Sequence, residues 1–330
     1  FIKEDFGLSW PHSFLGSLFV ILQVANLRFG WDLWRNLLGL TLLLLMLAAW
    51  RYGRHLLPIT IGLSVMTVLT NQFAAVTLFS TCAIALGLGA LRYRRRAVGL
   101  ALLPAFTLFI ANLYVVYFIN APIGQNVILA LQARGHFANY VLEFGSAFNF
   151  WNSFLSFGIF ALGLLPLFAL IGLNKEKEIA ALCLATLAFA TWSPIFPTAG
   201  LPQWWRWVLD LGLPLSIYGF YAILRIGGLA SQLLGRVGRF ASWKPAIQTV
   251  IVVILILPFG VQAMNYVSSP PSQPAAAFVN PQWNIYLPKT LVGTSINPDD
   301  VPATLQAVAW LTGNAPSGSV VLAEARFMGW

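Results

Sequence analysis

Residues 202–224 read PQWWRWVLDLGLPLSIYGFYAIL, and this stretch decides the fold class. It is long and apolar enough to cross a lipid bilayer, yet it carries Arg206 and Asp210. A charged side chain inside a membrane helix costs about 2.5–3.5 kcal/mol on insertion scales, so such residues point to a function by default. The i,i+4 spacing places both charges on one helix face. The stretch therefore predicts a membrane helix with a charge pair near one end.

The composition of the chain is that of a polytopic membrane protein. Of the 330 residues, 58% are hydrophobic and 9% are charged, whereas a soluble domain has about 25% charged residues. The mean hydropathy is +0.77. Eight apolar segments are interpreted as spans, near 33–50, 56–71, 73–91, 97–118, 154–173, 179–196, 204–224 and 247–266.

Two of these segments and a ninth stretch need a separate interpretation. The second and third spans are short and meet at Asn71-Gln72, which favours a tight hairpin. Residues 12–28 are apolar but are interrupted by several polar side chains. We interpret them as a helix lying in the membrane interface.

The charges in the loops predict the orientation. One set of connections, at 51–54, 92–96, 175–178 and 225–244, holds 12 basic and 2 acidic residues, a net charge of +10. The other set holds 7 basic and 8 acidic residues, a net charge of −1. Basic loops face the cytoplasm, so the first set is predicted to be cytoplasmic. Because topology explains the basic charge, no nucleic-acid partner is expected.

Two segments are predicted on the outer side. Residues 119–153 form a long outer loop, and 267–330 form an extracytoplasmic region that opens with a Pro/Ser linker. Within it, INPDDVPATLQAVAWLTG (296–313) is typical of a helix and SVVLAEA (319–325) of a strand. The predicted fold is an all-α polytopic membrane domain over 1–266, followed by the start of a small α/β extracytoplasmic domain.

The sequence shows no motif of a soluble active site. The histidines His12, His55 and His136 are far apart, and no cluster has zinc-ligand spacing. Cys82 and Cys183 lie in apolar segments and are interpreted as small buried hydrophobic residues.

Three stretches resemble the GT-C superfamily of membrane glycosyltransferases, which use sugars linked to polyprenyl phosphates. Residues 9–55, SWPHSFLGSLFVILQVANLRFGWDLWRNLLGLTLLLLMLAAWRYGRH, are similar to a juxtamembrane helix, a short FG break, an Arg-led span and a basic turn. Residues 204–223, WWRWVLDLGLPLSIYGFYAI, are similar to a late span with an arginine at its outer end. Residues 301–330 resemble the start of the soluble domain of oligosaccharyltransferase-like members. The stretch 325–330, ARFMGW, lacks the acid of their Trp-Trp-Asp-Tyr-Gly-like run.

The resemblance implies a multi-pass enzyme of the plasma or inner membrane. Such an enzyme moves a sugar from a polyprenyl phosphate or diphosphate to a protein or glycan acceptor at the extracytoplasmic face. Its catalytic carboxylate lies in the first outer loop, matched here by Glu4 or Asp5 or by a residue before Phe1. The cofactor is left open, with a divalent cation, Mg²⁺ or Mn²⁺, as one option, and no ligands are assigned to it.

The resemblance and the charge argument together give the candidate substrate-binding residues. Arg206 is expected to bind the lipid-linked phosphate, since a guanidinium group matches phosphate oxygens, and Asp210 is expected to orient it. The remaining candidates, all on the predicted outer side, are Trp205, His12, Arg134, His136 and Glu143.

Other interpretations stay open. Arg206 and Asp210 can be a self-neutralising structural pair beside an interfacial belt of tryptophans. A transporter or flippase also uses intramembrane charges and helices interrupted by proline, although no inverted repeat is seen. A ligase that moves a polysaccharide from a lipid carrier to an acceptor is a third alternative.

Overall fold

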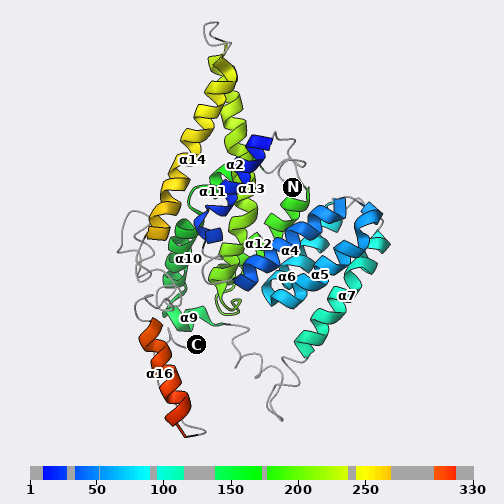
Figure 1. Cartoon of the computed structure of the whole chain (residues 1–330), viewed down its shortest axis with the longest axis vertical. Helices are drawn as coiled ribbons and strands as arrows, with labels where there is room; N and C mark the ends of the chain where they lie inside the picture. Colours follow the sequence, from blue (N-terminus) through cyan, green and yellow to red (C-terminus); the bar gives the residue numbers. More distant parts are fainter. Residues whose placement is uncertain are drawn as a thin grey trace.

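The computed structural model describes residues 10–27, 34–51, 53–89, 95–114, 138–172, 177–236, 243–268 and 301–316, which are mostly helical (Figure 1). The helices are α2 (Trp10–Ile21), α4 (Trp34–Arg51), the short 3₁₀ helix η1 (Gly53–Leu56), α5 (Leu57–Thr70), α6 (Gln72–Gly87), α7 (Arg95–Tyr114), α9 (Tyr140–Phe144), α10 (Ala147–Leu162), α11 (Leu165–Gly172), α12 (Lys177–Ile195), α13 (Trp204–Leu234), α14 (Lys244–Ser268) and α16 (Val301–Asn314). Within these ranges the only β-pairing is an isolated bridge between Ala138 and Gly200.

The long apolar helices support a membrane protein. Among the described residues, α12, α13 and α14 are long and apolar enough to cross a membrane, and the bent pair α10–α11 can make a fourth crossing. Shorter apolar helices lie in α4, α5, α6 and α7. Each of the eight segments predicted as spans coincides with one of these helices or with the bent pair, so the all-helical part of the prediction is confirmed.

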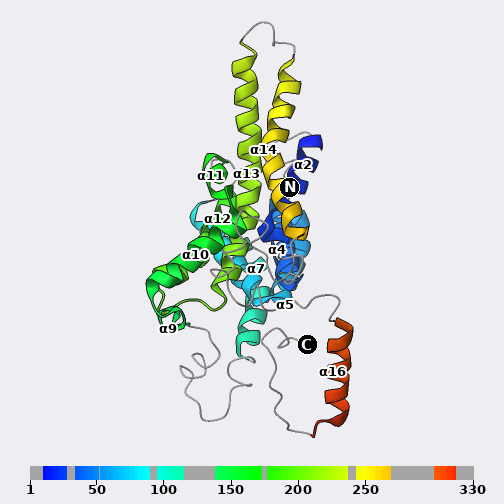
Figure 2. The ribbon, with the colours of Figure 1, turned by 90° about the vertical axis from the view of Figure 1, so that its left-hand side faces the viewer.

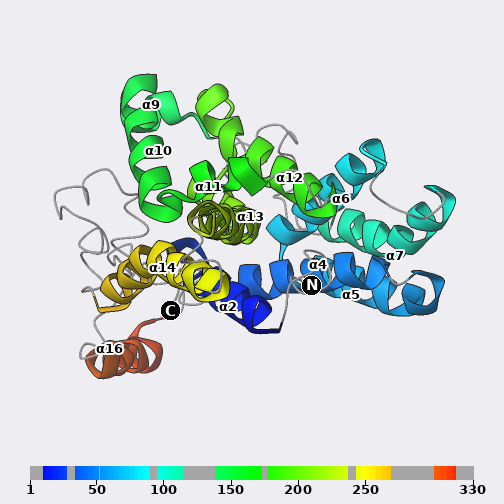
Figure 3. The same cartoon turned by 90° about the horizontal axis from the view of Figure 1, so that it is seen from above.

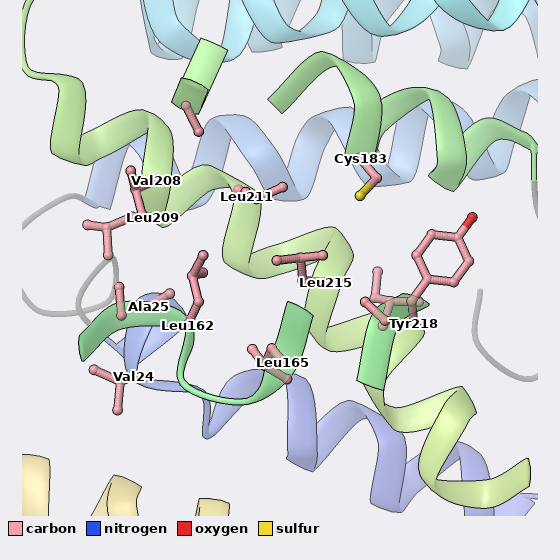
Figure 4. Close-up of a cluster of buried hydrophobic side chains, with 14 of the residues drawn as sticks. Val24, Ala25, Leu162, Leu165, Cys183, Val208, Leu209, Leu211, Leu215 and Tyr218 are labelled. Carbon is pink, nitrogen blue, oxygen red and sulfur yellow. The ribbon is translucent and has the colours of Figure 1, made fainter. Parts of the chain in front are cut away.

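Helix α13 is at the centre of one core. Seen from above (Figure 3), it lies among α12, α11, α2 and α14. Small residues let these neighbours approach: a Cβ on Gly212 would lie 2.5 Å from Ala25 Cβ, and a Cβ on Gly172 would lie 2.6 Å from the Tyr218 carbonyl oxygen. The core between them contains the side chains drawn in Figure 4, among them Val24, Ala25, Leu162, Leu165, Cys183, Leu211 and Leu215.

Helices α4 to α7 form a second group beside this core (Figures 1 and 3). There, Phe79 on α6 contacts Phe106 and Phe109 on α7, with ring centroids 5.4 and 5.5 Å apart. Helices α4 and α12 belong to both groups. For α12, Cys183 faces the α13 core and Leu182 faces the second core. These two helices therefore hold the groups together.

The span predicted at 154–173 is broken in the structure. Helices α10 and α11 meet at 68°, and Gly163 between them has a φ of +52°. This left-handed conformation suits glycine, which has no Cβ to clash with the backbone. An apolar run alone does not reveal such a bend, so the sequence predicted one straight helix.

Helix α2 packs into the bundle. Gly16 faces the ring of Phe220, and the ring of Phe19 lies 5.1 Å from that of Phe259 on α14. Its outward face carries the exposed apolar side chains of Trp10 and Phe14. An interfacial helix needs a polar outer face. The contacts therefore favour a helix within the bundle over the interfacial position predicted for 12–28.

The C-terminal region is supported only as a helix. Helix α16 confirms the helix predicted over 296–313, and it lies at the opposite end of the molecule from the end of α13 and the start of α14 (Figures 1 and 2). The predicted strand at 319–325 lies outside the described residues. Since no strand is found in the part of the chain that the structure describes, the small α/β domain is not supported.

Candidate functional site at the Trp204 end

Several helices meet where α13 begins, and we call this region the Trp204 end. The ring of Trp207 lies 4.7 Å from Phe73, at the start of α6, and 4.7 Å from Phe189, near the end of α12. The turn at Asn71 reaches the start of α4, because Asn71 donates a hydrogen bond to the Asn36 side chain. The loop charges predict that this end is extracytoplasmic.

Part of the outer loop covers the start of α13. Ala138 pairs with Gly200 through two backbone hydrogen bonds of 2.9 and 3.0 Å. The Tyr140 hydroxyl donates to the Leu201 carbonyl at 2.5 Å, and the Tyr140 ring stacks on Phe150 at 4.6 Å. Phe150 in turn lies edge-on to Trp204. Residues of the 138–153 stretch therefore border the start of α13, and 119–137 lie outside the described residues.

Two titratable groups on α9 have raised pKa values. Burial raises the pKa of Tyr140 above its ordinary range, so its hydroxyl remains a hydrogen-bond donor. Glu143 is exposed on the same helix. The neighbouring protein still removes part of the water around its carboxyl group, and this raises the pKa of Glu143.

Aromatic rings hold Arg206 in the first turn of α13. The guanidinium carbon lies 5.1 Å from the ring centroid of Trp205 and 5.6 Å from that of Phe73. Both distances are within the range of a cation–π contact. The Arg206 side chain is half-buried, and its backbone N–H donates to the Gln203 carbonyl at 2.8 Å. The cation is thus placed beside the N-terminus of a long helix, where the helix dipole also favours anions.

The carboxylate of Asp210 is the unusual group of this site. Its side chain is 1% exposed, and neither oxygen has a hydrogen-bond partner in the described part of the chain. The charge of Arg206 acts on it, but no hydrogen bond joins the two groups. The predicted i,i+4 pair is therefore not joined by a hydrogen bond, and the orienting role of Asp210 stays a prediction.

Comparisons with known proteins give no relative of the chain. No protein-family model, no curated protein and no solved structure matches the chain. The resemblance to the GT-C superfamily therefore rests on the three sequence stretches quoted above.

The structure brings some of the predicted site residues together. Trp205 and Glu143 lie at the Trp204 end with Arg206 and Asp210. His12 does not, because nearby Gly16 packs against Phe220, which is about 24 Å along α13 from Trp204. Four predicted site residues lie outside the described residues: Glu4, Asp5, Arg134 and His136.

The divalent cation stays a prediction. Within the described ranges, no group of three or more His, Cys, Asp or Glu side chains could hold a metal ion. The carboxylates expected to serve the reaction, Glu4 and Asp5, lie outside those ranges.

Sequence reasoning missed the amides at the Trp204 end. Asn36, Asn71, Gln72 and Asn112 come from three helices, and Gln72 donates to Asn112 at 3.4 Å. The sequence did contain a signal, since Asn71-Gln72 interrupts an apolar run. The sequence predicts only a turn there. Hydrogen bonds between side chains 35 or 40 positions apart in the chain depend on how the helices pack.

Proposed function

We propose that the chain is a membrane glycosyltransferase that takes a sugar from a polyprenyl phosphate or diphosphate at the extracytoplasmic face. The observation that carries the proposal is the placement of Arg206. A half-buried guanidinium group, backed by aromatic rings, lies in the first turn of the most buried membrane helix. A cation in this position suits the phosphate of a lipid that lies in the outer leaflet.

The reaction transfers the anomeric carbon of the sugar from phosphate oxygen to an acceptor oxygen or nitrogen. The bond between the anomeric carbon and the phosphate oxygen breaks, and the leaving phosphate keeps the bonding electrons. Arg206 stabilises the negative charge that develops on the phosphate. A general base takes the proton of the acceptor.

The general base is assigned to Glu4 or Asp5 on the resemblance alone. Among the described residues, Glu143 is an exposed carboxylate at the Trp204 end. Its neighbour on α9, Phe144, contacts Phe150 on α10, and Phe150 contacts Trp204. Its raised pKa brings it closer to neutral pH, which suits proton transfer. Glu143 is thus an alternative base.

The test compares substitutions of Arg206 with the same substitutions of Arg225, an exposed arginine farther along α13. Arg206→Lys keeps the charge and loses the planar fork, so binding of a polyprenyl phosphate should weaken about tenfold or more. Arg225→Lys should leave binding unchanged. Equal affinity of the wild type and Arg206→Lys would overturn the assigned phosphate contact.

A double variant separates binding from folding. Arg206→Ala removes the charge nearest to Asp210, so any instability must be distinguished from lost binding. In Arg206→Ala/Asp210→Asn neither charge remains. Recovery of stability without transferase activity supports the proposal, whereas recovery of both shows that the two charges are only structural. Impermeant labelling of Gln203→Cys in intact cells checks the outward orientation, and labelling only after permeabilisation contradicts it.

A transporter is the second candidate, and Asp210 favours it. A carboxylate that is fully buried in a membrane bundle, with no hydrogen-bond partner among the described residues, is typical of an ion or substrate path. The two functions differ in their products. A transporter moves a labelled sugar lipid or solute across proteoliposomes unchanged, and the transferase releases free polyprenyl phosphate.

A further inference from the structure

We propose that four amide side chains at the Trp204 end, those of Asn36, Asn71, Gln72 and Asn112, form a subsite for the sugar ring of the lipid-linked donor. This inference rests on the proposed function, because it places the sugar beside the phosphate assigned to Arg206. The four residues come from the start of α4, the α5–α6 turn and the end of α7.

Hydrogen bonds join the four amides in two pairs, which we call the row of amides. Asn71 donates to Asn36, and Gln72 Nε2 donates to Asn112 Oδ1 at 3.4 Å. Since Asn71 and Gln72 are adjacent in the chain, the two pairs lie at the same end of the bundle, one toward α4 and the other toward α7. The next residue, Phe73, has its ring 5.6 Å from the guanidinium carbon of Arg206. The amides and the proposed phosphate contact therefore lie at the same end of the bundle.

The row still has hydrogen-bonding capacity. The Asn36 side chain is 2% exposed, and its Nδ2 has no hydrogen-bond partner in the part of the chain that the structure describes. Gln72 and Asn112 are exposed and Asn71 is half-buried, so a ligand can reach the row from outside. Buried polar groups without partners are uncommon in native proteins, and a bound ligand is one reason for them.

The chemistry of the row suits a neutral polyhydroxylated ring. Each amide offers a donor and an acceptor side by side, which matches neighbouring hydroxyl groups. None of the four side chains carries a charge, so the row has nothing to neutralise an ionic ligand. The rings of Phe73 and Trp207 lie next to it and provide apolar faces of the kind on which the C–H face of a sugar packs.

Helix lengths place the row below the outermost part of the bundle. Helix α5 has 14 residues, which gives a rise of about 21 Å, less than the roughly 30 Å of a bilayer core. Trp207, at the level of Phe73, contacts Phe189, and α12 continues from there to Ile195, about 9 Å farther. The amides thus lie inside the rim formed by the end of α12, at the end of the bundle that the loop charges predict to face outward, where the polar headgroup of a lipid-linked donor can reach them.

The experiment measures binding of purified full-length protein to two lipids. One is bare nonaprenyl phosphate, and the other is the same lipid carrying mannose, glucose or N-acetylglucosamine. The wild type should bind at least one of the sugar-carrying lipids more tightly than the bare lipid. Gln72→Ala and Asn112→Ala should each weaken binding of that lipid about three- to tenfold, as the loss of one hydrogen bond predicts, and leave the bare lipid unaffected.

Two further variants keep the test independent of folding. The Asn71 side chain caps α6 by accepting from the Phe73 N–H at 2.7 Å. Asn71→Asp retains this acceptor but loses the donor to Asn36, so it should lower sugar-lipid affinity, and its melting temperature shows how much of the loss comes from folding. Gln232→Ala removes an exposed glutamine at the far end of α13 and should change neither affinity.

The outcomes separate the two proposals. If the wild type binds both lipids equally, or if the amide variants weaken both equally, the sugar subsite is wrong and the phosphate site stands. If the wild type binds neither lipid, the proposed function fails and the subsite fails with it.

Discussion

Helices α13 and α14 lie side by side (Figure 2) but are built for opposite surroundings. The rest of the protein buries 89% of the apolar segment of α13 but only 17% of the apolar segment of α14. Helix α14 nevertheless has the higher mean hydropathy, 2.2 against 1.5. Helix α13 carries Arg206, Asp210 and buried small residues, whereas α14 exposes side chains such as Leu257 and Met264. The comparison teaches that polar and small residues, which need protein neighbours, mark the central helix of a membrane bundle, and that the most apolar helix faces lipid.

The largest expected difference comes from removing a large side chain. Trp204 is 3% exposed and packs against Phe150 and Phe157 with ring centroids 5.4 and 5.5 Å away. Trp204→Ala should destabilise the protein by about 3–5 kcal/mol. Met264→Ala on α14, where the side chain is 75% exposed, should change stability by less than about 0.5 kcal/mol. Thermal unfolding of the purified variants measures both, and similar losses would show that α14 is also buried by protein.

Adding a methyl group gives the next largest difference. In Gly172→Ala the new Cβ would lie 2.6 Å from the Tyr218 carbonyl oxygen of α13, so α11 and α13 have to separate. The expected loss is about 1–3 kcal/mol. Gly260→Ala on α14 meets no atom within 4 Å and should be neutral or up to about 1 kcal/mol stabilising, because alanine favours a helix. Equal melting temperatures for the two variants would contradict the close packing of α13.

A smaller effect is expected at Asp210, and in the opposite direction. Because its buried carboxylate has no hydrogen-bond partner among the described residues, Asp210→Asn should stabilise the protein by about 1 kcal/mol, and the activity of this single variant is the reference for Arg206→Ala/Asp210→Asn. The measurement is the melting temperature together with transferase activity. A loss of stability of the same size would show that the membrane or a ligand satisfies the carboxylate.

The smallest effect concerns the cover over the start of α13. Tyr140→Phe removes the hydrogen bond to the Leu201 carbonyl and should cost about 0.5–1 kcal/mol. Because the pKa of Tyr140 is raised in the folded protein, its contribution is fully present below the unfolded value of about 10 and is lost as the pH rises above it. A melting curve against pH should therefore fall more steeply above about pH 10 in the wild type than in Tyr140→Phe. Identical slopes would contradict the buried hydroxyl.

The sequence predicted the helices well, because membrane spans are read from local composition. All eight apolar runs coincide with helices, and the helix predicted at 296–313 is α16. The errors concern features that depend on packing between helices. Helix α13 was expected to end at Leu224 but continues to Leu234, past Arg225, which remains exposed and donates to the Ile171 carbonyl at 3.4 Å. A charge ends an apolar run without ending a helix.

The candidate site was predicted in part. Its centre, Arg206 with Trp205, follows from charges placed in an apolar run, a signal that needs no knowledge of the fold. The partners of that centre do not follow. Helical spacing predicted that Arg206 would face Asp210, whereas the guanidinium group also lies over Phe73, a residue 133 positions earlier in the sequence. The Asn36–Asn71 contact could not be predicted either, because contacts between side chains of different helices produce no periodic pattern in the sequence.

The length of α13 has a mechanical consequence. The helix runs from Trp204 to Leu234 as 31 residues without interruption, about 46 Å, well beyond the roughly 30 Å of a bilayer core. Beyond its last turn, Gly235 lies against the side chain of Lys244 at the start of α14. The helix is continuous through Pro214, so a tilt imposed at Arg206 is carried toward the Leu234 end. A fluorophore at Gln232, at the end that the loop charges predict to be cytoplasmic, would then report whether the Trp204 end is occupied.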